Sequence, residues 1–233
     1  MLFRSTDEGD WQRFFAVTGD VIAQVPYYSA IGNHDTGRAG DELRAFDQVF
    51  SLPPGPAGRP PATTYFSYDI ANVHFVFVDS NAYDRREQRE WFAADLADAR
   101  ARKVRAIVVA CHDGPYSRGS HRGNLTAQRD YVPAMKQYKV DLVLSGHDHI
   151  YQRGSVDGID YIVTGGGGAS LYSQACGLPG KRKCTVDDGM AFFAKVHHYL
   201  IVTIDRGQIE TCARKADGSA VEPCTKRKLK RYP

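Results

Sequence analysis

Apolar residues recur at helical spacing in two long stretches of the chain. Between Trp11 and Val25 a stripe of aromatic and aliphatic residues predicts a helix, with Asp10 as its candidate N-cap and Pro26 ending it. The segment Glu87–Arg102 shows the same spacing, and basic residues lie at its C-terminal end, where they suit the helix dipole. Two further helices are predicted over Glu42–Phe46 and over Thr126–Tyr138, the latter with Thr126 as its cap.

Shorter apolar runs predict strands between and after these helices. Val104–Ala110 and Asp141–Ser145 are almost continuously apolar, as expected of strands that are buried on both faces of a sheet. Alternating segments predict hairpins that turn at Ala71-Asn72 and at Arg206-Gly207. The other predicted strands are Tyr27–Ile31, Thr64–Ile70, Val73–Asp79, Ile159–Thr164, Tyr199–Asp205 and Gln208–Arg214. Because strands alternate with helices first and form hairpins later, we expect an α/β sandwich with mixed sheets.

No internal repeat or linker divides the chain, so we expect one domain over residues 1–233 with a solvated basic tail from about residue 225 to 233. The hydrophobic fraction of 42% and the charged fraction of 24% are ordinary for a soluble globular protein. A net charge of +3 is too small to indicate a nucleic-acid partner. No apolar run approaches the ~20 residues of a membrane span, and no signal peptide is visible.

Three short clusters follow predicted strands: Gly32-Asn33-His34-Asp35, Cys111-His112 and Gly146-His147-Asp148-His149. Binding sites of α/β sheets collect at the carboxyl ends of strands, so these clusters are expected to meet. Asparagine and histidine are neutral oxygen and nitrogen donors that suit Zn, Fe or Mn. A single histidine at a strand end is more often structural than a ligand. Three strand ends that each carry histidine or asparagine favour a metal site.

In that order, the clusters resemble those of the calcineurin-like metallophosphoesterases, in particular the purple-acid-phosphatase-like branch. The resemblance extends from Trp11 to about Glu210. It implies a sandwich of two mixed β-sheets flanked by helices, a pair of divalent or trivalent ions (Fe, Zn or Mn) and a phosphoester substrate. Two metals can generate hydroxide at neutral pH and hold both the attacking and the leaving oxygen, which is the chemistry that phosphoester hydrolysis needs.

The resemblance also implies a role for individual residues. Carried over to this chain, one ion is held by Asn33, His112 and His147 and the other by His149, while His34 is the general acid, Asp35 orients it and His121 binds the substrate. Two of these roles have alternatives, because Asp35 can instead cap the next turn and His121 can be an exposed loop histidine. Asp148 is expected to point away from the site and to serve its loop.

The family also places two metal-binding aspartates before the Gly-Asn-His cluster, the second in a Gly-Asp-x-x-Tyr motif. Asp7 and Asp20 match those motifs only in part: no apolar strand precedes Asp7, and Asp20 lies within a predicted helix, opposite its aromatic face. We therefore expect that the N-terminal strand–helix–strand unit is missing from this sequence and that the second ion is largely absent. The alternative function is that of a truncated or non-catalytic member of the same fold, acting as a binding or scaffold protein.

Four of the five cysteines lie in loops. They allow three pairings, of which the simplest joins Cys176 with Cys184 and Cys212 with Cys224. That pairing implies an oxidising compartment, so the protein is expected to be extracellular or periplasmic, against the alternative of four free thiols in the cytosol. Cys111 sits one residue before His112 in a strand and therefore faces the other side, buried and free.

Overall fold

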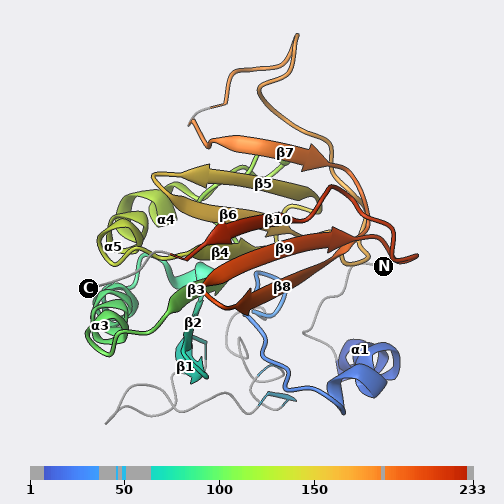
Figure 1. Ribbon diagram of the computed structural model, residues 1–233. Helices are drawn as coiled ribbons and strands as arrows, with labels where there is room; N and C mark the ends of the chain where they lie inside the picture. Colours follow the sequence, from blue (N-terminus) through green and yellow to red (C-terminus); the bar gives the residue numbers. More distant parts are fainter. Residues whose placement is uncertain (1–7, 37–45, 47–48, 51–63, 185–186, 230–233) are drawn as a thin grey trace.

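The computed structural model describes residues 8–36, 46, 49–50, 64–184 and 187–229. Its helical elements are α1 (Glu8–Ile22), η1 (Ser80–Ala82), α3 (Arg86–Ala101), α4 (Leu125–Asp130) and α5 (Val132–Gln137). Its strands are β1 (Phe66–Ile70), β2 (Val73–Val78), β3 (Ala106–Cys111), β4 (Leu142–Ser145), β5 (Tyr151–Val156), β6 (Ile159–Thr164), β7 (Met190–Ala194), β8 (Tyr199–Asp205), β9 (Gln208–Arg214) and β10 (Thr225–Lys228). They form two sheets, as the α/β sandwich prediction requires (Figure 1).

The larger sheet has seven strands in the order β1-β2-β3-β4-β6-β5-β7. Strands β2, β3, β4 and β6 run parallel, whereas β1, β5 and β7 pair antiparallel with their neighbours. The smaller sheet is antiparallel, in the order β10-β9-β8. The predicted hairpins at Ala71-Asn72 and Arg206-Gly207 are confirmed as the β1–β2 and β8–β9 pairs.

Two apolar layers stabilise this arrangement. One face of the larger sheet packs against helices α3, α4 and α5, with Leu96, Tyr131 and Val143 fully buried between them. The other face packs against the smaller sheet, where Ile162 meets Ile209. Both faces of the central strands are therefore covered, which explains why their sequences are almost continuously apolar.

The helices differ from the sequence expectations in two places. Helix α1 begins before Asp10, so this residue is not an N-cap but lies in the first turn and pairs with Arg13. The helix expected over residues 126–138 is two short helices, because Pro133 near the start of α5 has no N–H to continue the ladder. The cap of α4 is Asn124 rather than Thr126, and its side chain accepts a hydrogen bond from the backbone of Ala127.

The strands also required corrections. Tyr27–Ile31 is not a strand, because no described strand pairs with it; Tyr28 instead stacks on Tyr68 at 4.1 Å between ring centroids. Part of the expected basic tail is strand β10, whose Arg227 is paired with Asp160. Strands β5 and β7 also lie outside the sequence expectations. The helix expected over 42–46 lies, apart from residue 46, outside the described residues.

The cysteines pair as the simplest arrangement predicts. Cys176 is bonded to Cys184 and Cys212 to Cys224, while Cys111 is free and buried. Burial raises the pKa of the Cys111 thiol to about 12, so this side chain is a poor nucleophile. Among the helices that the structure describes, none has both the length and the apolar character that crossing a bilayer requires.

Candidate metal centre

The parallel strands β3 and β4 bring two of the predicted clusters together. Their register pairs Cys111 with Ser145, so His112 and Gly146 follow at the same level. The Gly146 N–H donates to the His112 carbonyl at 2.9 Å and extends the pairing past the strands. The clusters meet because both follow the carboxyl ends of adjacent parallel strands.

One of the predicted ligands, His112, contacts two others. The Nε2 atom of His112 is 2.7 Å from the Oδ1 atom of Asn33 and 3.1 Å from the Nδ1 atom of His147. The rings of His112 and His147 meet edge to face, with centroids 4.9 Å apart. One oxygen and two nitrogen donors from segments far apart in the sequence therefore converge on one small region.

The loop that carries Asn33 is closed by its own side chains. The N–H of Gly32 donates to the Oδ2 atom of Asp35 at 2.7 Å, and the Asp35 N–H donates back to the Gly32 carbonyl. The amide of Asn81, just after β2, donates to the same carbonyl. A Cβ at Gly32 would lie 2.8 Å from the Nδ1 atom of His112, so only glycine lets the ring approach this loop. Asp35 thus closes the Gly32 turn.

The loop after β4 takes a strained path to present His147. This residue has a φ of 61°, in the left-handed region that non-glycine residues rarely adopt. Asp148 points away from the three donors and is buried, and it accepts hydrogen bonds from the Ser117 hydroxyl and from the backbone N–H of His121. Those bonds hold the loop that carries His121, whose ring centroid is 4.1 Å from that of His147.

His149 is oriented by two residues that the sequence did not single out. Its Nδ1 atom lies 2.8 Å from the Ser170 carbonyl, which leaves Nε2 as the available donor atom. Its ring stacks on Tyr172 at 4.4 Å, and the Tyr172 N–H donates to the His149 carbonyl. Both partners follow the glycine run Gly165–Gly168 after β6, which is the signal in the sequence that could have pointed to this segment.

Two histidines of the cluster, His112 and His147, have lowered pKa values, which favour the neutral form. Burial, followed by the neighbouring His147, His34 and other histidines, lowers the pKa of His112 to about 3. Burial also lowers the pKa of His147, although the nearby Asp113 opposes this shift. Neutral imidazoles have a lone pair for a metal, whereas imidazolium ions do not. The protein therefore keeps these side chains in the state that a ligand needs.

The donor set fits a transition-metal ion but supplies no carboxylate to it. In the described part of the chain, no third histidine, cysteine, aspartate or glutamate donor lies within 4.8 Å of both His112 and His147. The donor atoms of His149 therefore do not come within that distance of both rings. Of the two aspartates that match the family only in part, Asp20 is exposed on α1, as expected, and Asp7 lies outside the described residues. The one tight group found, Glu210 with Cys212 and Cys224, has its sulfurs in a disulfide.

Comparison with known proteins agrees with this geometry. A family model described as "Calcineurin-like phosphoesterase" matches residues 5–151, more than half of the chain. The chain belongs to the calcineurin-like phosphoesterase family. The match contains the first two clusters and the Gly-His-Asp-His cluster, so it spans every residue with a role implied by the resemblance.

Within that family the chain resembles the purple acid phosphatases. Purple acid phosphatase 15 of Arabidopsis thaliana is 29% identical over 174 residues, which cover 68% of this chain and 32% of that protein. An uncharacterized protein of Mycobacterium tuberculosis is 25% identical over 226 residues, which cover 78% of this chain and 42% of the relative. The chain thus spans less than half the length of these relatives.

Among solved structures, the purple acid phosphatase PPD1 from yellow lupin (Lupinus luteus) seeds aligns with a TM-score of 0.80. The alignment covers 97% of this chain and 44% of that one at 20% identity, so it shows a shared fold. The predicted sandwich of two sheets flanked by helices is confirmed on this comparison, but only the larger sheet is mixed, because the pairs of the smaller sheet are antiparallel.

Proposed function

We propose that this chain forms part of a metal-dependent phosphoester hydrolase that uses a dinuclear centre. The observation that carries the proposal is the convergence of Asn33, His112 and His147, with 2.7 and 3.1 Å between their donor atoms. Two of these donors are histidines whose pKa values are lowered, so they are ready to bind an ion without losing a proton. A bound metal pair would supply hydroxide at neutral pH and neutralise charge on the phosphate.

The other residues of the cluster have roles around that centre. His149, with Nδ1 taken by the Ser170 carbonyl, presents Nε2 to the second ion. His34, partly buried beside Asn33, donates a proton to the leaving oxygen. His121, held beside His147 by Asp148, contacts the phosphate of the substrate. Asp35 acts through the Gly32 turn, which positions both Asn33 and His34.

We further propose that the protein acts outside the cytosol. The two disulfides support an oxidising compartment, extracellular or periplasmic. Mass mapping of the native protein without reductant tests this, since alkylation of four loop thiols would contradict it.

Ion binding by the purified chain tests the metal site. Titration of chelator-treated protein with Zn²⁺ or Mn²⁺ should show one ion bound by Asn33, His112 and His147, and a second ion bound more weakly near His149. We expect His112→Ala to weaken the binding of the first ion at least ~100-fold, since it removes the side chain that contacts both Asn33 and His147. His197→Ala is the control, because His197 is exposed and lies outside the cluster. Equal affinity in both variants would exclude this ligand set.

Hydrolysis of 4-nitrophenyl phosphate by the metal-loaded protein tests the reaction. We expect turnover that depends on the added ion and is lost in His112→Ala but not in His197→Ala. Ion binding without turnover in the wild-type chain would favour the non-catalytic alternative for the chain as it stands.

A further inference from the structure

A small pocket lies beside the His121 loop, between this loop and the disulfide-closed loop Cys176–Cys184. Its lining includes Gln128, the bonded Cys176 and Cys184, and the charged residues Arg122, Arg182 and Asp188. Its volume is about 20 Å³, little more than the ~10–15 Å³ that a single water needs on the same measure, and it opens to solvent. It therefore suits one small group of a ligand rather than an extended organic molecule.

The walls of this pocket are fixed by hydrogen bonds. Arg118 donates to both oxygens of the buried Asp188, with its Nε atom 2.8 Å from Oδ2. The Ala175 N–H donates to the Arg118 carbonyl at 2.7 Å and ties the disulfide loop to the His121 loop. The Gln128 amide donates to the Pro115 carbonyl. The two loops are thus held together by polar contacts, and the disulfide closes one of them.

Two guanidinium groups in the lining have no such partner. Within the described part of the chain, neither Arg122 nor Arg182 forms a side-chain hydrogen bond or ion pair. The one carboxylate of the lining, Asp188, already pairs with Arg118 and so does not compensate them. Two uncompensated cations on one small pocket repel each other, and an anion bound between them removes that repulsion. The planar guanidinium group matches the oxygens of a phosphate.

The pocket and the metal centre share a loop. His121 contacts His147 at the centre, and the next residue, Arg122, lines the pocket. Consecutive Cα atoms are ~3.8 Å apart, so the loop carries a residue of each place side by side. We propose that Arg122 and Arg182 form an anion subsite that binds a second phosphate group of a substrate whose scissile phosphate lies at the metal centre. The substrate class is then a polyphosphorylated compound, and this part of the proposal rests on the proposed function.

Phosphate binding without metal tests the subsite by itself. Inorganic phosphate is titrated calorimetrically into the chain in the presence of a chelator. We expect the double variant Arg122→Gln with Arg182→Gln to weaken binding roughly tenfold or more, the usual worth of charge-assisted bonds. The matched control is Arg206→Gln, another exposed arginine with a left-handed backbone, whose φ is 46°. Equal phosphate affinity in wild type and double variant, or an equal loss in the control, overturns the subsite.

Tripolyphosphate binding to the Zn²⁺-loaded chain separates a substrate group from free phosphate. If a single ligand spans the subsite and the metal centre, tripolyphosphate binds more tightly than phosphate. His112→Ala and the double arginine variant should then each weaken it by at least ~10-fold. If His112→Ala leaves the affinity for tripolyphosphate unchanged, the pocket binds free phosphate alone. That result would overturn the substrate assignment. The titration with chelator needs no metal. It therefore still tests the arginine subsite if the proposed metal centre is wrong.

Discussion

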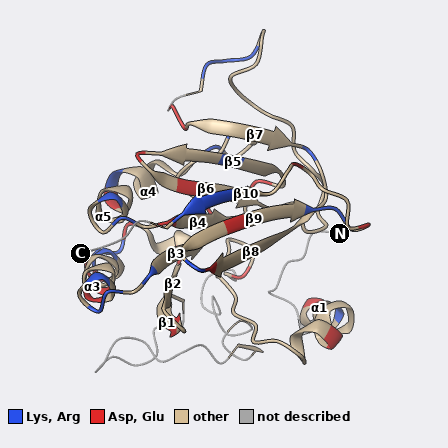
Figure 2. Ribbon diagram, in the orientation of Figure 1, with Lys and Arg blue, Asp and Glu red and all other residues tan. Residues whose placement is uncertain are grey.

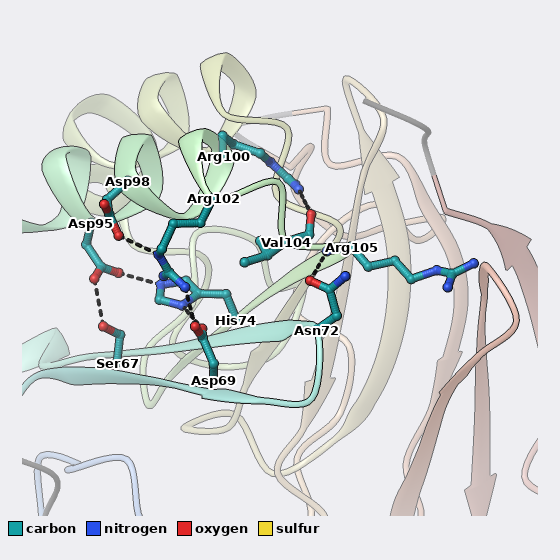
Figure 3. Close-up of polar contacts among 10 residues, drawn as sticks. All are labelled: Ser67, Asp69, Asn72, His74, Asp95, Asp98, Arg100, Arg102, Val104 and Arg105. Carbon is teal, nitrogen blue, oxygen red and sulfur yellow. Dashed lines mark hydrogen bonds and ion pairs between the residues drawn. The ribbon is translucent and has the colours of Figure 1, made fainter. Parts of the chain in front are cut away.

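Two groups of histidines in this protein have opposite surroundings. His74 in β2 is buried between two carboxylates, whereas His112 and His147 at the strand ends face each other and an asparagine. The Nδ1 atom of His74 is 2.6 Å from Asp69 and its Nε2 atom 2.8 Å from Asp95, with only 2% of the residue exposed (Figure 3). A neutral imidazole has one N–H, so two carboxylate contacts require the imidazolium form.

The surroundings of His74 form a latch between the β1–β2 hairpin and helix α3. Burial by itself lowers the pKa of His74, but the hydrogen bonds and charges of Asp95 and Asp69 outweigh it and raise the pKa. Asp95 also accepts from Ser67, and Asp69 is paired with Arg102, which in turn pairs with Asp98 (Figure 3). The latch therefore joins β1, β2 and the C-terminal half of α3 through charge.

The comparison teaches that the neighbours of a buried histidine decide its role. At the metal centre, burial and neighbouring histidines lower the pKa, so the rings stay neutral and keep lone pairs for a metal. At the latch, the carboxylates raise the pKa of His74 and favour the imidazolium form, which has no lone pair to offer. Acidic and basic residues are spread along the ribbon in Figure 2. Local pairing, rather than the net charge, therefore separates the two sites.

The largest expected effect distinguishes a proton donor from a ligand within the metal centre. In a form that hydrolyses phosphoesters, we expect His34→Ala to lower kcat ~10²–10⁴-fold, because general acid catalysis is lost. The bound metal should stay, since Asn33, His112 and His147 are unchanged. Steady-state kinetics together with metal analysis check this. If the variant loses its metal, His34 is a ligand and the roles assigned here are wrong.

Removal of the latch histidine tests the other side of the comparison. We expect His74→Ala to lower the free energy of unfolding by about 3 kcal/mol, because it leaves Asp95 partly buried without its cation. Ion affinity at the metal centre should not change. Urea unfolding and ion titration of the same variant provide both values. A variant that is as stable as the wild type would show that the latch contributes nothing.

The direction in which stability changes with pH tests the latch. The latch predicts that the free energy of unfolding falls as pH rises. The pKa of His74 is raised above its unfolded value near ~6.5, so its contribution is complete below that pH and is lost as pH rises through the folded pKa. The free energy of unfolding of the wild type should therefore fall towards that of His74→Gln, which cannot titrate, as pH rises from ~6 upwards. Chemical unfolding over this range measures the difference. A difference that grows with pH would contradict the charged form.

The smallest expected effect concerns Asp20, which matches a metal-binding motif of the family only in part. Its side chain is exposed on α1, so Asp20→Asn should leave ion affinity, turnover and stability within experimental error. Ion titration beside the wild type checks this. A loss of metal would mean that this aspartate reaches the centre.

Local patterns in the sequence were sufficient for much of the fold. The apolar runs predicted β3 and β4, the turn residues predicted the β1–β2 and β8–β9 hairpins, and helical spacing predicted α1 and α3. These patterns work because burial on one or both faces sets the side-chain period directly. Strand β10 was not predicted, because its sequence, Thr-Lys-Arg-Lys, is typical of a solvated tail. Only its neighbours, Asp160 and Glu210, supply the partners that make those cations fit.

The sequence by itself determined the chemistry of the centre: glycine, asparagine and histidine at three strand ends, with spacing that resembles a known family. Tertiary structure alone decided which of them meet. Parallel pairing of β3 with β4 brings His112 to His147, and the missing Cβ of Gly32 admits the His112 ring beside Asn33. The tertiary structure also decided in which direction the pKa values of His74 and His112 are shifted. Protonation depends on burial and on partners such as Asp69 and Asp95, which only the folded chain brings to His74.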